Sequence, residues 1–194
     1  MSPGIRGLLL CGGASTRFGS NKLLASPGHG EPPIVASAAR SLLAGAGSAL
    51  AVIPSGAREL RAILGPLGCE IVESDQTFAG IGASLAAGVA ATPGAAGWIV
   101  ALGDMPFILA GTIAAVRLAL ESGALLAAPV HLASRERGHP VGFSHALAKE
   151  LLALRGDEGA RGVLARHREA LTLVKVDDPG IYLDIDTPGD FAKR

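Results

Sequence analysis

A segment near the N-terminus, residues 10–22, combines residue types that suit phosphate binding, and its start overlaps the end of a short apolar run. Two adjacent glycines let backbone N–H groups approach a ligand closely, and a nearby serine adds a hydroxyl donor. An arginine and a lysine add two positive charges that suit a polyphosphate. The residues that would form this phosphate-binding loop are Gly12, Gly13, Ser15, Arg17 and Lys22.

Two common phosphate-binding motifs do not match this loop. A P-loop reads G-x-x-x-x-G-K-[ST], but Phe18 stands five residues after Gly13. A dinucleotide fingerprint reads G-x-G-x-x-G, and the order Gly12-Gly13-Ala14 breaks it. The alternative to a phosphate site is a glycine-rich turn whose charged side chains are solvated.

Asp104 is a candidate metal ligand because it follows the apolar run 98–102, at the point where a strand would end. Pro106 keeps Met105 out of the helical region, so the chain stays extended just beyond the carboxylate. Mg²⁺ prefers one or two carboxylates together with phosphate oxygens and waters. A helix cap or a turn is the alternative role for this aspartate. Together with the phosphate-binding loop, Asp104 points to a nucleoside triphosphate bound with magnesium.

Asp184 and Asp186 are two residues apart, so on a strand their side chains share one face. Either carboxylate could complete the metal site. Asp186 or Thr187, which stand before Pro188, could instead cap a helix that begins with proline.

These three segments, in this order and spacing, resemble the MobA-like nucleotidyltransferase family over nearly the whole chain. The opening pattern of the family, G-G/A-x-S-x-R-x-G-x-x-K, is matched at every position between Gly12 and Lys22. The family's G-D-M-P matches residues 103–106, and its D-I-D-T-P-x-D matches residues 184–190.

Within this family the sequence is most similar to the molybdenum cofactor cytidylyltransferases. Gly138, His139 and Pro140 match their central G-H-P, and residues 80–85 match their glycine- and serine-containing helix entry. Residues 11–13 read C-G-G, which is closer to the A-G-G of guanylyltransferases than to the A-A-G of cytidylyltransferases. The choice between CTP and GTP therefore stays open.

The resemblance implies a three-layer α/β/α Rossmann-like sandwich with a mostly parallel sheet. It also implies a reaction in which CMP moves from CTP to the terminal phosphate of a molybdopterin-type acceptor, with Mg²⁺, and pyrophosphate leaves. GTP as donor and another small phosphorylated acceptor are the alternatives within the family. A molybdenum hydroxylase apoenzyme is the partner that the resemblance implies. Because the acceptor phosphate itself attacks, the protein needs charges that stabilise the phosphate oxygens and no side-chain nucleophile.

The resemblance also implies roles for individual residues. Arg17 would bind the β- and γ-phosphates, and Lys22 would bridge the α-phosphate and the incoming phosphate. Asp104 would hold Mg²⁺, with Asp186 or Asp184 as a second ligand. The remaining implied contacts are Gly80, Gly82 and Ser84 with the nucleotide, and Gly138, His139 and Pro140 with the acceptor. His139 would either bond the acceptor phosphate or order its loop.

The order of elements supports the same fold class. Apolar runs alternate with helical patterns at a spacing of about 20 residues, which predicts βαβ units and a largely parallel sheet. Strands are expected over residues 7–11, 49–53, 71–72, 98–102, 125–129, 141–143, 171–176 and 181–185. Helices are expected over residues 34–43, 58–64, 84–91, 112–120, 146–154 and 160–168, with a last one near Pro188. We expect one domain over residues 1–194, with ligands at the carboxyl ends of its strands.

Composition excludes several classes of protein. Lys and Arg total 17 and Asp and Glu total 17, without a basic run, which argues against binding nucleic acid through its phosphates. A hydrophobic content of 49% excludes a disordered chain. No apolar run approaches the ~18–20 residues of a membrane span. Cys11 and Cys69 form neither a disulfide framework nor a zinc motif, so we expect reduced thiols and a cytoplasmic protein.

Two other functional classes remain as competitors. An NAD(P)-dependent oxidoreductase is disfavoured by the broken dinucleotide fingerprint. A non-catalytic cofactor carrier is disfavoured because Arg17, Lys22 and Asp104 are all present.

Overall fold

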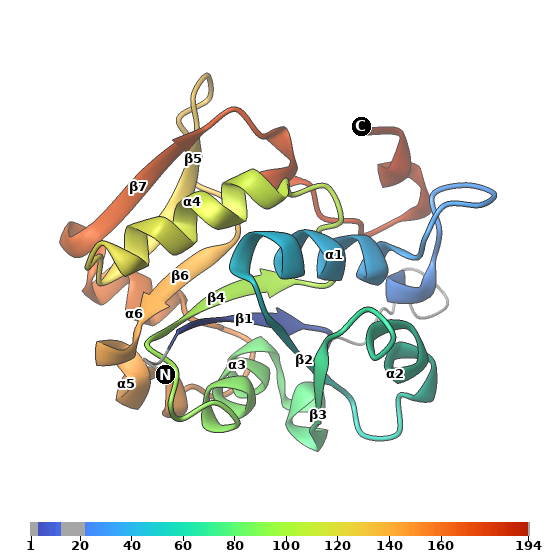
Figure 1. Cartoon of the computed structure of the whole chain (residues 1–194), viewed down its shortest axis with the longest axis horizontal. Helices are drawn as coiled ribbons and strands as arrows, with labels where there is room; N and C mark the ends of the chain where they lie inside the picture. The colour runs from blue at the N-terminus through green and yellow to red at the C-terminus, as the bar shows by residue number, and fades with distance from the viewer. Residues whose placement is uncertain (1–3, 13–21, 194) are drawn as a thin grey trace.

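A computed structural model describes residues 4–12 and 22–193, and in this part of the chain seven strands form one sheet (Figure 1). The order of strands across the sheet is β3-β2-β1-β4-β6-β5-β7. The strands are β1 (Ile5–Leu10), β2 (Ala49–Ile53), β3 (Glu70–Glu73), β4 (Gly97–Leu102), β5 (Leu126–His131), β6 (Val141–Ser144) and β7 (Leu171–Val176).

The direction of β6 differs from that of the other strands. It is antiparallel to both of its neighbours, β4 and β5, whereas the other adjacent pairs are parallel. The other six strands therefore end at one edge of the sheet, and β6 begins at that edge. Residues that precede β6 consequently meet residues that follow β1 and β4.

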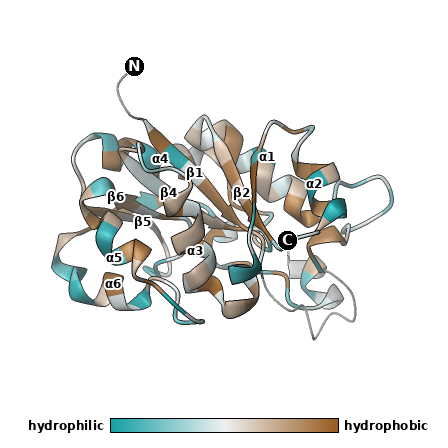
Figure 2. Ribbon diagram, turned by 90° about the horizontal axis from the view of Figure 1, so that it is seen from below, coloured by the Kyte–Doolittle hydropathy of each residue, from teal (hydrophilic) through white to brown (hydrophobic). Residues whose placement is uncertain are grey.

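Helices cover both faces of this sheet, because side chains of successive strand residues point to opposite faces. Leu9 and Ala51 face a core formed with α1, α2 and α4, whereas Leu8 and Val52 face a core formed with α3, α5 and α6. Figure 2 shows the central strands as mostly hydrophobic, with hydrophilic residues on the helices and outer loops. The predicted three-layer α/β/α sandwich is confirmed. The helices are α1 (Ile34–Ala46), α2 (Arg58–Leu64), α3 (Ile81–Ala90), α4 (Ala110–Glu121), α5 (Ala148–Leu152) and α6 (Arg161–Arg166).

Short 3₁₀ helices connect these elements, and two of them replace elements that the sequence predicts differently. The prediction of a strand over residues 181–185 is wrong, because residues 179–182 form a 3₁₀ turn. The side chain of Asp178 caps the start of this turn by accepting a hydrogen bond from Gly180 N. The predicted final helix is a 3₁₀ helix that begins at Pro188. The 3₁₀ helices are η1 (Lys22–Leu24), η2 (Asp75–Ala79), η3 (His145–Leu147), η4 (Arg168–Ala170), η5 (Pro179–Tyr182) and η6 (Pro188–Lys193).

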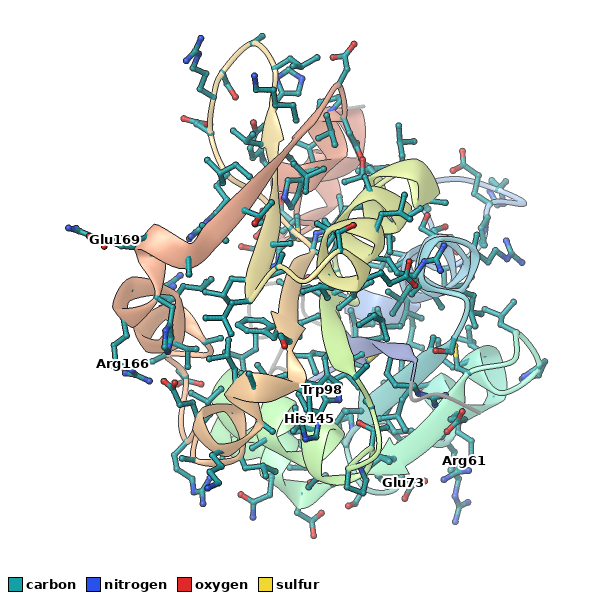
Figure 3. All side chains as sticks on the ribbon, turned by 60° about the vertical axis from the view of Figure 1, so that its left-hand side comes forward. Arg61, Glu73, Trp98, His145, Arg166 and Glu169 are labelled. Atoms are coloured by element: carbon teal, nitrogen blue, oxygen red, sulfur yellow. The ribbon has the colours of Figure 1, made fainter. Side chains whose placement is uncertain are left out.

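Trp98 illustrates how the strands pack into the core (Figure 3). Its ring is fully buried, its Nε1 donates to Thr92 Oγ1 at 2.8 Å, and it stacks on His145 with ring centroids 5.6 Å apart. This residue is a packing element of the sheet and does not contact the site described below. No helix in the described segments has the length and apolar content needed to cross a bilayer.

The close approach of α1 and α4 depends on a residue without a side chain. A Cβ atom built on Gly45 in α1 would lie 2.5 Å from Ile113 Cβ and 2.6 Å from Ala110 O in α4. The two helices are further joined by Arg117, whose Nε donates to Gly45 O at 3.1 Å.

We therefore expect Gly45→Ala to lower the free energy of unfolding by about 1–3 kcal/mol, because the methyl group forces the two helices apart. Gly111→Ala is the matched control, since a Cβ there meets no atom within 4 Å and only the helix propensity changes. That control is expected to raise the free energy of unfolding by up to about 1 kcal/mol. Urea denaturation of both variants measures the difference, and equal stability of the two would contradict this account of the packing.

Candidate active site

The ends of β1 and β4 bring the first two predicted site segments together. These strands are adjacent and parallel, and Leu10 pairs with Leu102. Gly103 N donates to Leu10 O at 3.0 Å, which fixes the start of the G-D-M-P segment beside Gly12. A Cβ on Gly12 would lie 3.0 Å from Ser84 Oγ, so the glycine lets the chain pass close to α3.

Lys22 links this edge of the sheet to the C-terminal segment. Its Nζ lies 2.8 Å from Asp104 Oδ2 and 2.7 Å from Asp186 Oδ1. Partial burial lowers the pKa of the lysine, but the hydrogen bonds to the two carboxylates outweigh this effect and the net pKa is raised. The ammonium is therefore charged at neutral pH, within reach of both carboxylates.

Asp186 reaches Lys22 because a turn in the C-terminal segment is held from both sides. Ile185 N donates to Asp104 O at 2.9 Å. Asp190 Oδ2 accepts hydrogen bonds from the backbone nitrogens of Asp186 at 3.0 Å and Thr187 at 2.7 Å. The carboxylate that orders this turn is thus that of Asp190, which leaves Asp186 facing Lys22. Asp184 is exposed, and its charge acts on His139.

Asp178, which the sequence analysis did not single out, anchors the same segment. Its buried side chain accepts hydrogen bonds from Leu109 N at 2.9 Å, Thr112 Oγ1 at 2.5 Å and Gly180 N at 2.9 Å. The first two donors lie at the start of α4, directly after the G-D-M-P segment. The order Asp178-Pro179-Gly180 is a turn signal that could have identified it.

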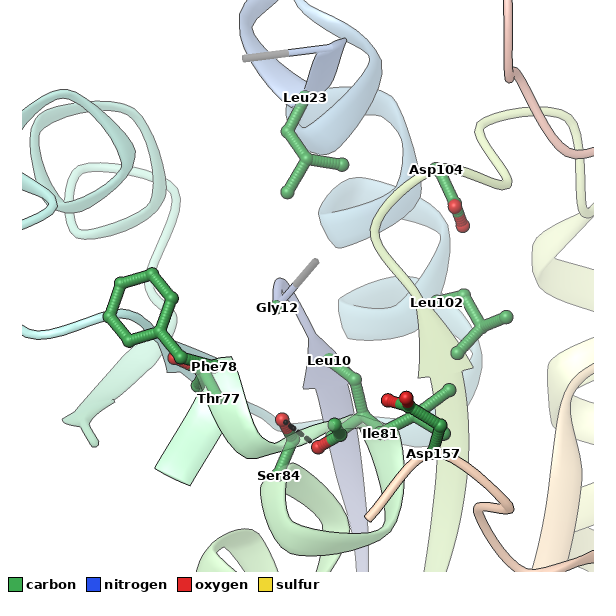
Figure 4. A pocket seen from close by; sticks show the side chains of 11 residues that line it. Leu10, Gly12, Leu23, Thr77, Phe78, Ile81, Ser84, Leu102, Asp104 and Asp157 are labelled. Atoms are coloured by element: carbon green, nitrogen blue, oxygen red, sulfur yellow. Dashed lines mark hydrogen bonds between the residues drawn. The ribbon is translucent and has the colours of Figure 1, made fainter. Parts of the chain in front are cut away.

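A pocket of about 350 Å³ opens at this edge of the sheet (Figure 4). Four predicted residues line it, namely Gly12, Gly80, Ser84 and Asp104. The sequence analysis missed three polar or aromatic lining residues, namely Thr77, Phe78 and Asp157. The ring of Phe78 is 72% exposed and lies across the pocket from Asp104, so an aromatic face is available at its rim.

Gly80 and Gly82 have a second role, which is to admit the loop before α6. Gly80 has φ +115°, and a Cβ there would lie 2.3 Å from Asp157 Oδ1. Gly82 N donates to Gly156 O at 2.8 Å, and a Cβ on Gly82 would lie 2.9 Å from Arg155 O. Gly82 thus packs under this loop and does not line the pocket. The close contact brings Asp157 to the pocket wall.

The predicted acceptor residues lie beside this pocket because β6 is antiparallel. His139 and Pro140, joined by a cis peptide bond, precede β6 and so stand at the edge where β4 ends. Gly138 N donates to Pro129 O at 3.0 Å and His139 N donates to Ile181 O at 2.9 Å. A Cβ on Gly138 would lie 2.3 Å from Ile181 O, so only glycine allows this approach.

A second pocket, of about 330 Å³, contains Gly138 and His139. It shares four lining residues with the first pocket, which are Leu10, Ile81, Leu102 and Asp157. Two adjoining pockets at one sheet edge can hold two reactants side by side. Gly13, Ser15 and Arg17 lie outside the described residues.

Asp104 meets the requirement for a metal ligand in one respect. Its Oδ1 atom is buried and has no hydrogen-bond partner among the described residues, although Oδ2 bonds Lys22. No cluster of three or more His, Cys, Asp or Glu ligands occurs within the part of the chain that the structure describes. A magnesium ion needs only one or two carboxylates when phosphate oxygens and waters complete its shell.

Cys11, which stands next to Gly12, is not suited to act as a nucleophile. Burial raises the pKa of its thiol well above the usual range, and the nearby Cys69 and Asp104 add to the effect. A thiol of raised pKa holds little of the reactive thiolate form.

The pKa of His139 is shifted by the surroundings of its ring. Burial lowers the pKa of its ring below the usual 6.5, against the opposing influence of Asp104. As pH falls below 6.5, the unfolded chain takes up this proton more readily than the folded one, so His139 lowers stability there. When the pH is lowered from neutral to below 6.5, we expect the free energy of unfolding to fall less in His139→Gln than in the unmodified protein.

Urea denaturation at the two pH values tests this expectation, with His29→Gln as the control for removal of an exposed histidine. NMR titration of the His139 ring gives the midpoint directly. A midpoint at or above 6.5 would contradict the lowered pKa.

Comparison with known proteins identifies the family and the fold. A family model described as MobA-like NTP transferase domain matches residues 7–171. A comparison with curated proteins finds no match. The structure of Rv0371c from Mycobacterium tuberculosis H37Rv is similar with a TM-score of 0.83 and 26% identity, over 100% of this chain and 97% of that one.

Two further solved structures share the fold. Rv0371c in complex with manganese has a TM-score of 0.78 and 23% identity, covering 98% of this chain and 97% of its own. Mth528, a nucleotidyl transferase from Methanothermobacter thermautotrophicus, has a TM-score of 0.79 and 23% identity, covering 97% and 94%. As its motifs predict, the chain belongs to the MobA-like NTP transferase family of nucleotidyltransferases.

Proposed function

We propose that this nucleotidyltransferase moves CMP from CTP to the terminal phosphate of a molybdopterin-type acceptor and releases pyrophosphate. The observation that carries the proposal is the position of Lys22, whose amine lies 2.8 Å from Asp104, a lining residue of the first pocket, which adjoins the second. A fixed cation beside the first of two adjoining pockets suits the transfer of a charged group from one ligand to the other.

The first pocket would hold the nucleotide. The backbone of Gly12 lines the pocket at the carboxyl end of β1. Ligands of parallel sheets bind at the carboxyl ends of the strands. Phe78 offers an exposed aromatic face on which a base can stack. Gly13, Ser15 and Arg17 would complete the phosphate contacts, as the family resemblance implies.

The second pocket would hold the acceptor, beside Gly138, His139 and Pro140. In the proposed reaction an oxygen of the acceptor phosphate attacks the α-phosphorus of CTP. A new P–O bond forms as the bond from the α-phosphorus to the bridging oxygen of pyrophosphate breaks. Lys22 stabilises the negative charge on the phosphate oxygens. Arg17 stabilises the negative charge on the leaving pyrophosphate.

Asp104, with Asp186 as a second ligand, would hold a divalent cation, for which we propose Mg²⁺. The unpartnered Oδ1 atom of Asp104 supports this assignment, and manganese in a structure of Rv0371c supports a divalent metal in this fold. When bound, the ion would neutralise phosphate charge. A molybdenum hydroxylase apoenzyme is the proposed recipient of the product.

A guanylyltransferase is the second candidate. Residues 11–13 read C-G-G, and Gly12 stands at the middle position, where the resemblance gives glycine for the guanylyl branch and alanine for the cytidylyl branch. The same geometry would then transfer GMP from GTP, to molybdopterin or to another small phosphorylated acceptor.

Calorimetric titration with CTP and with GTP, each with and without Mg²⁺, tests the choice of nucleotide. We expect CTP to bind in a magnesium-dependent manner and GTP to bind at least tenfold more weakly, about 1.4 kcal/mol. Asp104→Ala should remove the magnesium dependence, whereas Asp177→Ala, at a carboxylate 85% exposed, should not. Preferred binding of GTP would replace the first candidate by the second, and binding of neither nucleotide would overturn both.

Pyrophosphate release tests the residues that act on the phosphates. We expect Lys22→Ala to lower kcat by about 10²–10³, because a preorganised charge contact is lost. Asp104→Ala should abolish metal-dependent turnover while circular dichroism shows an intact fold. Lys175→Ala removes an exposed lysine on β7 and should leave kcat unchanged. An unchanged kcat in Lys22→Ala would remove this residue from the mechanism.

A further inference from the structure

The second pocket brings together two cations from distant parts of the chain. Arg137 precedes β6 and Arg161 begins α6, and both line the pocket with His139. The charges of both arginines act on the His139 ring, which places all three groups near one another. The sequence analysis did not connect these two residues.

Neither arginine is paired within the part of the chain that the structure describes. No ion pair or side-chain hydrogen bond joins Arg137 or Arg161 to another described residue, although Asp157 and Glu158 line the same pocket. Other arginines are paired, such as Arg166 with Glu150 and Arg61 with Glu73 (Figure 3). The donors of the two pocket guanidinium groups are therefore not used by any described residue.

The chemistry of an arginine pair indicates the ligand. A guanidinium group presents planar, paired N–H donors that match phosphate oxygens, and it stays charged at every physiological pH. His139 is neutral at pH 7, because burial lowers its pKa, and it can therefore add a hydrogen bond without a charge. The pocket thus has an anion-binding side.

Another part of the pocket lining is apolar. It is formed by buried side chains of α3, the sheet and α6, which are Leu85, Val100, Val141, Phe143 and Leu164. A ligand that satisfies both sides needs a charged group and an apolar or aromatic body. A small, fully polar phosphorylated acid would leave this wall without a partner.

We propose that Arg137 and Arg161 bind the phosphate of the acceptor, and that the acceptor is a phosphate monoester with an apolar or aromatic body. This inference rests on the proposed function only in naming the ligand as the acceptor. It selects among the phosphorylated acceptors that the family resemblance leaves open, in favour of a ring system and against a small polar acid.

Calorimetry with phenyl phosphate and with inorganic phosphate tests the proposal without turnover. We expect phenyl phosphate to bind more tightly than inorganic phosphate, because only the former contacts the apolar wall. Arg137→Gln and Arg161→Gln should each weaken phenyl phosphate binding at least tenfold. Both residues are exposed, so the variants should keep the fold, and thermal unfolding checks this.

Matched controls separate a specific site from general charge. Arg135→Gln and Arg168→Gln remove exposed arginines outside the pocket and should leave phenyl phosphate binding unchanged. Equal weakening by the controls, unchanged binding in the two pocket variants, or no binding to the unmodified protein would each overturn the proposal. The calorimetry with CTP and GTP is independent of these residues, so failure of the proposed function there is distinguishable from failure here.

Discussion

The attachment of the C-terminal segment to the start of α4 is the constraint on which the site depends. Asp178 is buried, and its carboxylate accepts hydrogen bonds from three donors, one in the first turn of α4 and one at the residue directly before it. Burying a carboxylate is costly unless such donors surround it, so this arrangement holds one conformation of both segments. Gly180 packs directly against Phe107, where a Cβ would lie 2.2 Å from the carbonyl oxygen. Asp104 and Asp186 thereby acquire a fixed separation that Lys22 can bridge.

The charges around Lys22 are not balanced within the described residues. One ammonium group, that of Lys22, faces two carboxylates, and one oxygen of Asp104 is buried without a hydrogen bond. The buried Asp104 oxygen leaves an acceptor that the lysine does not use. A divalent cation bound as proposed would use this acceptor and offset part of the negative charge.

The sequence predicted the parts of the fold that depend on local pattern. The apolar runs of β1 and β4, and the residues that follow them, were placed correctly at one sheet edge. The apolar alternation of Ile181 and Ile185 predicted a strand that is absent, because burial against the rest of the molecule satisfies these residues without strand pairing. The antiparallel direction of β6, the contact of Asp157 with Gly80 and the position of Arg137 and Arg161 in one pocket all depend on tertiary packing. No local pattern contains that information.

The bond between Lys22 and Asp186 joins residues 164 positions apart. Closing so long a loop has an entropic cost, which the contacts of the C-terminal segment must offset. Asp186 follows all seven strands of the sheet in the described chain, so during synthesis on the ribosome it is the last of the three charged residues to emerge. Local detachment of the C-terminal segment in the finished protein would likewise separate Asp186 from Lys22 without unfolding the sheet.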